Sequence, residues 1–175
     1  MKRRLRQLPR KMKGRGLRRT PPPLSLKYAV WGFLSGTAGI LAILAVTRVA
    51  GHPLLIGSFG ASAVLLFGAA ESPLAQPRNV VGGHLISAAT AVAVVACIGT
   101  GPVAIALAVG LATFLMYVTR TVHPPGGATA LIGVQGQVGL SFLVDPVLVG
   151  TLILLGVALF TNNIVHHRHY PEHWL

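Results

Sequence analysis

Charged side chains are scarce in this sequence. They make up 10% of the 175 residues, and only three residues are acidic, whereas soluble domains average about 25% charged residues. More than half of the chain, 53%, is hydrophobic. The composition therefore excludes an ordinary soluble domain and indicates a membrane protein.

Cysteine is nearly absent, and so are the motifs of common enzymes. The single cysteine, Cys97, excludes an internal disulfide and a multi-cysteine metal site, and we expect it to be a small packing residue. The sequence shows no nucleophile beside a base, no phosphate-binding or dinucleotide-binding glycine loop and no metal-hydrolase spacing. We therefore expect no enzymatic activity, no cofactor and no bound metal. The histidine-rich end, residues 166–175, is expected to be a solvated tail at the membrane interface; its histidines are His166, His167, His169 and His173.

Positive charge is concentrated at the N-terminus. Ten of the 15 Lys and Arg residues lie among the first twenty residues, so the net charge of +12 belongs mostly to this tail. Such a cluster fits either a nucleic-acid arm or a topology determinant that stays cytoplasmic. We favour the second, with membrane lipid and not nucleic acid as its partner. Residues 1–24 are thus expected to be a disordered cytoplasmic tail on an integral protein of a bacterial inner membrane, with the C-terminus also cytoplasmic.

Long apolar runs divide residues 25–165 into candidate membrane spans. Four runs read as spanning helices, and two shorter ones, broken by glycine or glutamine, are doubtful. The firm spans are residues 28–50, 79–100, 103–119 and 146–162, and the doubtful ones are 54–70 and 126–143. We expect an all-α membrane domain of four transmembrane helices plus two short re-entrant or half-helices. The alternative is six spans arranged as an inverted 3+3 repeat.

Short motifs recur in the same order in the two halves of this domain. The motifs Val-Thr-Arg, His-Pro, Gly-Ala-Ser/Thr-Ala and Gly-x-Leu-Ile each occur twice. The last two are separated by the same 67 positions, from Gly60 to Gly127 and from Gly83 to Gly150. This pattern predicts an internal duplication, and transporters commonly place their sites between such repeats.

The stretch TRTVHPPGGATAL, residues 119–131, predicts a sharp break followed by a new helix. Residues before proline avoid the helical region, a proline suits the first helical turn, and glycine permits close backbone approach. Helix N-termini attract anions, so one such start in each repeat, with an arginine nearby, predicts an electropositive passage. The arginines could equally end their helices and reach back to the interface. The expected lining residues are Arg48, Gly60, Ser62, Arg120, His123, Pro124, Pro125, Gly126, Gly127 and Thr129.

Three further residues in the membrane domain can titrate. Glu71 is expected either to form a structural ion pair or to take up protons during transport, and Asp145, which precedes Pro146, is expected to cap the last helix. His84 lies inside a span, where an imidazole either moves protons or bonds a neighbouring backbone group.

Three blocks of the sequence resemble the HPP family of integral membrane proteins: TRTVHPPGGATAL, FGASAVLLFGA and ESPLAQPRNVVGGHLI. The resemblance covers about residues 25–165 and implies a four-span transporter; relatives from plastids and cyanobacteria are linked to nitrite. The positions it marks as typical of the family are Gly60, Glu71, Pro73, Gln76, Pro77, Arg78, Asn79, His123, Pro124, Pro125, Gly126 and Gly127.

Two functions remain open at this point. The first is a transporter or channel for a small anion such as nitrite, and the second is a non-transporting membrane scaffold or assembly protein. A pore lined by Arg120 and His123 would favour transport, and a solidly packed centre would favour the scaffold. Because four short spans enclose little space, we also expect a homo-oligomer.

Overall fold

The computed structural model describes residues 25–165 and 168–174, and this part of the chain is helical, without strands. The basic tail, His166 and His167 lie outside the described residues. The helices are α3 (Leu26–Ala50), α4 (Gly57–Ala63) with its π-helical continuation η1 (Val64–Gly68), the 3-10 turn η2 (Pro73–Ala75), α5 (Pro77–Cys97), α6 (Pro102–Val118), α7 (Pro124–Gln135), the π-helical η3 (Leu143–Leu148) and α8 (Val149–Ile164).

Proline and glycine set several of these boundaries. Pro77, Pro102 and Pro124 each occupy the first turn of a helix, where a missing N–H costs nothing. Helix α3 ends at Gly51, whose left-handed backbone (φ 78°) lets its N–H bond the Thr47 carbonyl. Residues at the boundaries themselves therefore determine where these helices begin and end.

The helices fall into two length classes. Three segments are long and apolar enough to cross a membrane, namely α3, α5 and the continuous Leu143–Ile164. Helix α6, which covers the remaining expected span at residues 103–119, has 17 residues. The two doubtful runs form shorter helices: α7 has 12 residues, and α4 continues through η1 only to Gly68. At about 1.5 Å per residue, 12 residues reach about 18 Å, well short of a hydrocarbon core about 30 Å thick.

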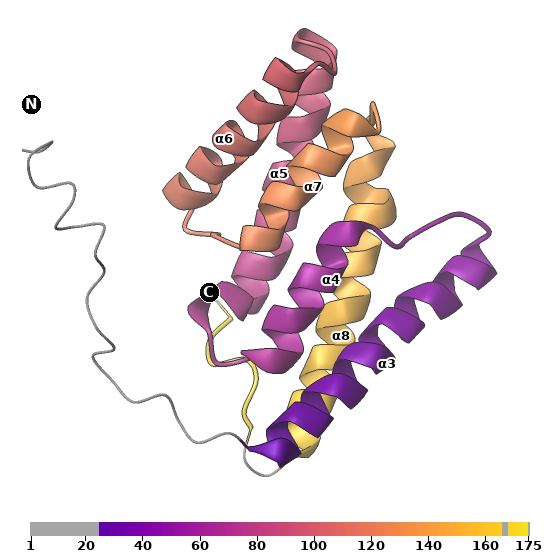
Figure 1. The fold of residues 1–175 in the computed structure, drawn as a ribbon, viewed down its shortest axis with the longest axis vertical. Coiled ribbons are helices and arrows are strands. Elements are labelled where there is room, and N and C mark those ends of the chain that lie inside the picture. Colours follow the sequence, from indigo (N-terminus) through magenta and orange to yellow (C-terminus); the bar gives the residue numbers. More distant parts are fainter. Residues whose placement is uncertain (1–24, 166–167, 175) are drawn as a thin grey trace, which may run out of the picture.

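The chain reverses direction from each labelled helix to the next (Figure 1). Helices α3, α5 and α7 run one way, and α4, α6 and α8 run the other. Helix α3 packs mainly on α8, while α5, α6 and α7 pack on one another, and α4 lies against α7. The start of α3 and the end of α8 lie at the same end of the molecule.

Among the described residues, three buried apolar clusters hold the helices together, and two of them are large. The first surrounds α4 and η1, where Phe59, Leu66 and Phe67 are buried against α3 and α8. The second joins α5, α6 and α7 through small side chains: Ala91, Ala104, Ala108, Ala112 and Ala130. Small residues let membrane helices approach closely, because helix association in lipid depends on packing. Cys97, expected to pack inside, is exposed at the end of α5 instead.

Asp145 has the extended backbone of a helix N-cap (φ −128°, ψ 111°) directly before Pro146, but its Oδ1 is buried without a hydrogen-bond partner among the described residues. Its Oδ2 lies 2.7 Å from Nδ1 of His52. The carboxylate therefore ties the connection after α3 to the start of the last helix.

The C-terminal segment docks on the membrane domain. Tyr170 is buried, and its hydroxyl donates to the Ala75 carbonyl over 2.7 Å. Arg168 donates to the Phe67 carbonyl over 2.8 Å, and its guanidinium lies 5.1 Å from the centre of the Tyr28 ring. The expectation of a solvated tail is therefore wrong at Tyr170, because its phenol ring and hydroxyl both find partners at the end of the helix bundle.

Candidate functional site

Two histidines share one serine hydroxyl at the centre of the fold. His84 projects from α5, His123 precedes α7, and Ser62 lies on α4. The Ser62 Oγ lies 2.8 Å from the Nε2 atom of each histidine. All three side chains are fully buried. Residues that are 22 and 61 positions apart thus form one contact.

The network continues from both histidines. The Nδ1 of His84 lies 2.7 Å from the Thr129 Oγ1, and Thr129 in turn donates to Ser58 Oγ over 2.8 Å. On the other side, His123 Nδ1 bonds the Leu74 carbonyl over 2.8 Å. The result is a continuous hydrogen-bonded chain from η2, through α5 and α7, to the first turn of α4. Polar groups this deeply buried are retained when they are paired, and inside membranes they mark functional sites.

Close packing of α5 against α7 makes this chain possible. His123 has an extended backbone (φ −135°, ψ 103°), as expected before Pro124. A Cβ added to Gly83 would lie 2.5 Å from the His123 Cβ, and one added to Gly126 would lie 2.8 Å from the Ser87 Oγ. Only glycine fits these two positions, and the histidines are within reach of each other because of it: their ring centres are 4.9 Å apart.

The Leu74 carbonyl is held by a folded connection between η1 and α5. The buried Gln76 side chain donates to the carbonyls of Ala70 and Ser72 over 3.0 and 2.9 Å. Its Oε1 accepts the Glu172 N–H over 2.9 Å. The connection that orients His123 is thus fixed from both sides.

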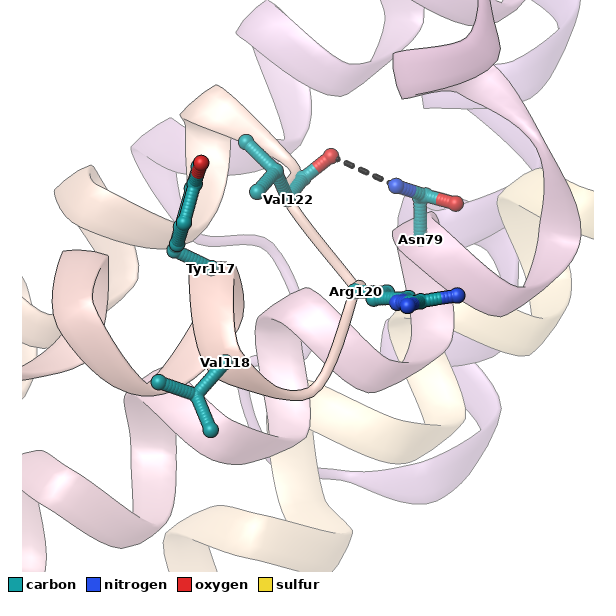
Figure 2. A pocket seen from close by; sticks show the side chains of 5 residues that line it. All are labelled: Asn79, Tyr117, Val118, Arg120 and Val122. Carbon is teal, nitrogen blue, oxygen red and sulfur yellow. Dashed lines mark hydrogen bonds between the residues drawn. The ribbon is translucent and has the colours of Figure 1, made fainter.

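Arg120 lies in a surface pocket and not at the histidines. The pocket has a volume of about 550 Å³ and is lined by Asn79, Tyr117, Val118, Arg120 and Val122. Figure 2 shows Arg120 and Asn79 on the same side of the segment that leads to α7, where Asn79 Nδ2 donates to the Val122 carbonyl over 2.8 Å. Arg120 has a left-handed backbone, with φ of 57°. The pocket brings one cation next to the segment that carries His123, but His123 does not line it.

Other expected site residues lie apart from the network. Arg48 is exposed in the last turn of α3, and Glu71 and Gly60 are exposed as well. Helices α3 and α6, which end at Ala50 and Val118 close to the two arginines, finish far apart in Figure 1. The structure therefore does not bring the two arginines together, since each lies where its helix reaches the surface. Beside the buried Pro125 and Gly126, Pro124 is exposed and Gly127 makes no close approach.

Sequence reasoning missed two members of the network. Ser58 lies one helical turn before Ser62, and this spacing placed both hydroxyls on one face of α4. The Leu74 carbonyl gave no signal, because a backbone acceptor does not depend on its side chain. Within residues 25–165 and 168–174, no cluster of three or more His, Cys, Asp or Glu residues is placed to hold a metal ion.

Comparison with known proteins identifies relatives over most of the chain. The family described as "HPP, transmembrane region" matches residues 21–171. Two Dictyostelium discoideum proteins, each described as a transmembrane protein, are similar. The first is 43% identical over 177 residues, 94% of this chain and 62% of that protein; the second is 44% identical over 174 residues, 93% and 56%. The chain thus spans about three fifths of the length of these curated relatives. No solved structure matches it.

Proposed function

The chain belongs to the HPP family of transmembrane proteins, and from that premise we propose that it carries a small anion, such as nitrite, across the membrane. The observation that carries the proposal is the buried network of His84, Ser62 and His123. Ionisable side chains in the middle of a membrane domain are costly and are typical of ion and substrate pathways.

The closed centre favours a carrier over an open channel. The side chains of the network are shielded from solvent, and the Arg120 pocket stops short of His123. We therefore interpret the structure as an occluded arrangement that opens to one side at a time. The pocket beside Arg120 would serve as the vestibule on one side, where the guanidinium attracts anions.

Two related halves would supply the moving parts. We propose that α3, α4 and α5 form one repeat and α6, α7 and α8 the other, with six passes in inverted order. Because α4 with η1 and α7 are short, their two passes would be completed by the non-helical residues beside them. The alternating chain direction in Figure 1 supports this arrangement of repeats. Two tight contacts support it as well: Gly126 lies against Gly83, and Gly150 lies against the Phe59 ring, which an added Cβ would overlap. A shift of 67 positions converts Phe59 into Gly126 and Gly83 into Gly150, so the two contacts join equivalent positions of the two repeats.

The number of passes determines on which sides of the membrane the two ends of the domain lie. An even number of passes places both ends of the domain on one side, which we propose is the cytoplasmic side because the tail is strongly basic. We propose a bacterial inner membrane as the location and a homo-oligomer as the assembly.

The competing function is a membrane scaffold or assembly protein. The solidly packed centre is the observation that favours it, since a scaffold needs no path. In that case the basic tail would bind anionic lipid or a partner, and the histidine network would only fix the packing of α4, α5 and α7.

Uptake into proteoliposomes tests the proposal. Nitrite, nitrate, formate and chloride are offered to liposomes with wild-type protein, the Ser62→Ala variant or the Ser35→Ala variant. Ser35 is a matched control, because its hydroxyl is also buried but has no hydrogen-bond partner among the residues that the structure describes. We expect uptake of at least one anion above that of empty liposomes, a large loss in Ser62→Ala and wild-type rates in Ser35→Ala. Arg120→Ala should lower uptake most at low salt, where a vestibule charge is least screened.

Two results would contradict the proposal. In the first, no anion enters faster than it enters empty liposomes. In the second, Ser62→Ala folds and transports like the wild type, which would remove the network from the path.

A further inference from the structure

The Ser62 hydroxyl has one hydrogen to donate, and two ring nitrogens lie within hydrogen-bond distance of it. The Leu74 carbonyl can only accept, so the 2.8 Å contact requires His123 Nδ1 to carry a hydrogen. In a neutral ring, Nε2 is then a bare acceptor that faces Ser62. A hydroxyl has one hydrogen to give, and this ring alone uses it.

The second ring leads to the same requirement. When the Thr129 hydroxyl donates its hydrogen to Ser58 over 2.8 Å, its oxygen accepts from His84 Nδ1 at 2.7 Å. A neutral His84 with hydrogen on Nδ1 also has a bare Nε2, and this atom too lies 2.8 Å from the Ser62 oxygen. Two acceptors then meet one hydroxyl hydrogen. In this arrangement of hydrogens, the trio of His84, Ser62 and His123 is one proton short of full hydrogen bonding.

One added proton completes the trio. If His84 Nε2 gains a hydrogen, it donates to Ser62, and Ser62 donates to His123. If His123 Nε2 gains the hydrogen instead, the same two bonds run in reverse. The proton can therefore sit on either ring without movement of any heavy atom, and Ser62 passes it between them.

No other charge lies in this core. Within the described part of the chain, the buried polar side chains include no Lys, Arg, Asp or Glu. Hydroxyls face the two rings from α4 and α7, the Phe59 ring faces His84 from α4, and a carbonyl faces His123 from η2. Each imidazole is the titratable neighbour of the other. An anion crossing this core would meet no fixed countercharge, and an isolated charge in a medium of low dielectric constant is very costly.

We propose that one proton accompanies each anion and that the trio of His84, Ser62 and His123 binds this proton during transport. This inference rests on the proposed function. The proton leaves water on one side, forms an N–H bond at an imidazole Nε2 while the monovalent anion lies nearby, and returns to water on the other side with the anion. Net charge moved is zero, so transport is electroneutral symport. Glu71, the other candidate for coupling, is exposed and takes no part in this core.

The test measures anion, proton and voltage together. Proteoliposomes containing a trapped pH dye receive nitrite, and potassium with valinomycin sets the membrane potential at zero, positive or negative inside. Empty liposomes correct for nitrous acid that crosses the bilayer unaided. We expect one proton to enter per protein-dependent nitrite, at a rate that does not change with the potential.

Variants locate the proton. In His84→Gln and in His123→Gln, an amide replaces the imidazole and can donate and accept hydrogen bonds but cannot take up a proton. Both variants should lose nitrite uptake and acidification together. His52→Gln is the matched control, because His52 is a half-exposed histidine outside the trio, and it should keep both. Chromatographic profiles in detergent establish that each variant is folded, and a weakly buffered detergent solution gives a second readout, proton uptake upon nitrite binding, which wild type shows and His84→Gln lacks.

Each outcome decides something. Nitrite uptake that follows the potential without acidification overturns proton coupling and leaves anion transport standing. Coupled uptake that survives in folded His84→Gln and His123→Gln proteins overturns the trio as the proton site. Absence of protein-dependent uptake for all four anions overturns the proposed function and this inference with it.

Discussion

Replacing Gly126 by alanine should destabilise the protein, whereas the same change at Gly127 should not. The added Cβ at Gly126 would lie 2.8 Å from the Ser87 Oγ and 2.9 Å from the Gly83 carbonyl oxygen, a backbone atom that cannot move aside alone. At Gly127 the nearest heavy atom is a Val109 methyl at 4.0 Å. Both changes lie in the first turn of α7, so any gain in helix propensity is nearly the same in the two variants and cancels in their difference.

The difference follows from packing alone. Inserting a methyl group into a filled core typically costs about 1–3 kcal/mol. For a chain of this size, each kcal/mol lowers the melting temperature by about 2–4 °C, so Gly126→Ala should melt about 2–12 °C below Gly127→Ala. Thermal unfolding in detergent, followed by circular dichroism, measures this. Equal melting temperatures for the two variants would mean that α5 and α7 are not in the close contact on which the network depends.

Two more predictions concern other packing contacts of the fold. Gly150→Ala should destabilise the protein because the new methyl group would overlap the Phe59 ring, with a typical cost of about 1–3 kcal/mol. Gly156→Ala is the control, because a methyl group at that position meets open space. If the clash is the cause, Phe59→Leu should partly restore the stability of Gly150→Ala. Tyr170→Phe removes the bond to Ala75 and should cost about 0.5–1.5 kcal/mol, which denaturant unfolding detects. Burial raises the pKa of Tyr170, so the stability that its protonated hydroxyl contributes is full below about pH 10 and is lost as pH rises toward the folded-state pKa; an unchanged alkaline stability profile in Tyr170→Phe would contradict this.

The helices could be predicted from the sequence because their signals are local. Apolar runs and prolines such as Pro77, Pro102 and Pro124 fix where helices begin, and the structure has helices over all six expected runs. The direction of the two short helices was open, because length alone does not distinguish a half-helix that returns from one that continues across.

The sequence indicated four of the residues that meet in the network, but not how they are arranged. Ser62, His84, His123 and Thr129 were each singled out, yet no pattern in the sequence states that two imidazoles share one hydroxyl, since that contact depends on tertiary packing. The repeat even pointed away from it, because the counterpart of His84 is Thr151, which donates to the Val147 carbonyl of its own helix. The arginines were misplaced for a related reason: proximity to a motif in sequence is not proximity in space.

The docking of the C-terminal segment has a practical consequence for anyone who labels or immobilises this protein. Tyr170 anchors on Ala75, and the neighbouring Leu74 carbonyl fixes the hydrogen position on His123. A bulky tag or a pulling force applied to the last residues therefore acts on a segment that only two hydrogen bonds separate from the imidazole of His123. These are the bonds from Tyr170 to Ala75 and from His123 to Leu74. Attachment at the N-terminus places no load on this segment. A comparison of the two attachments measures how strongly the C-terminal segment is bound to the helix bundle.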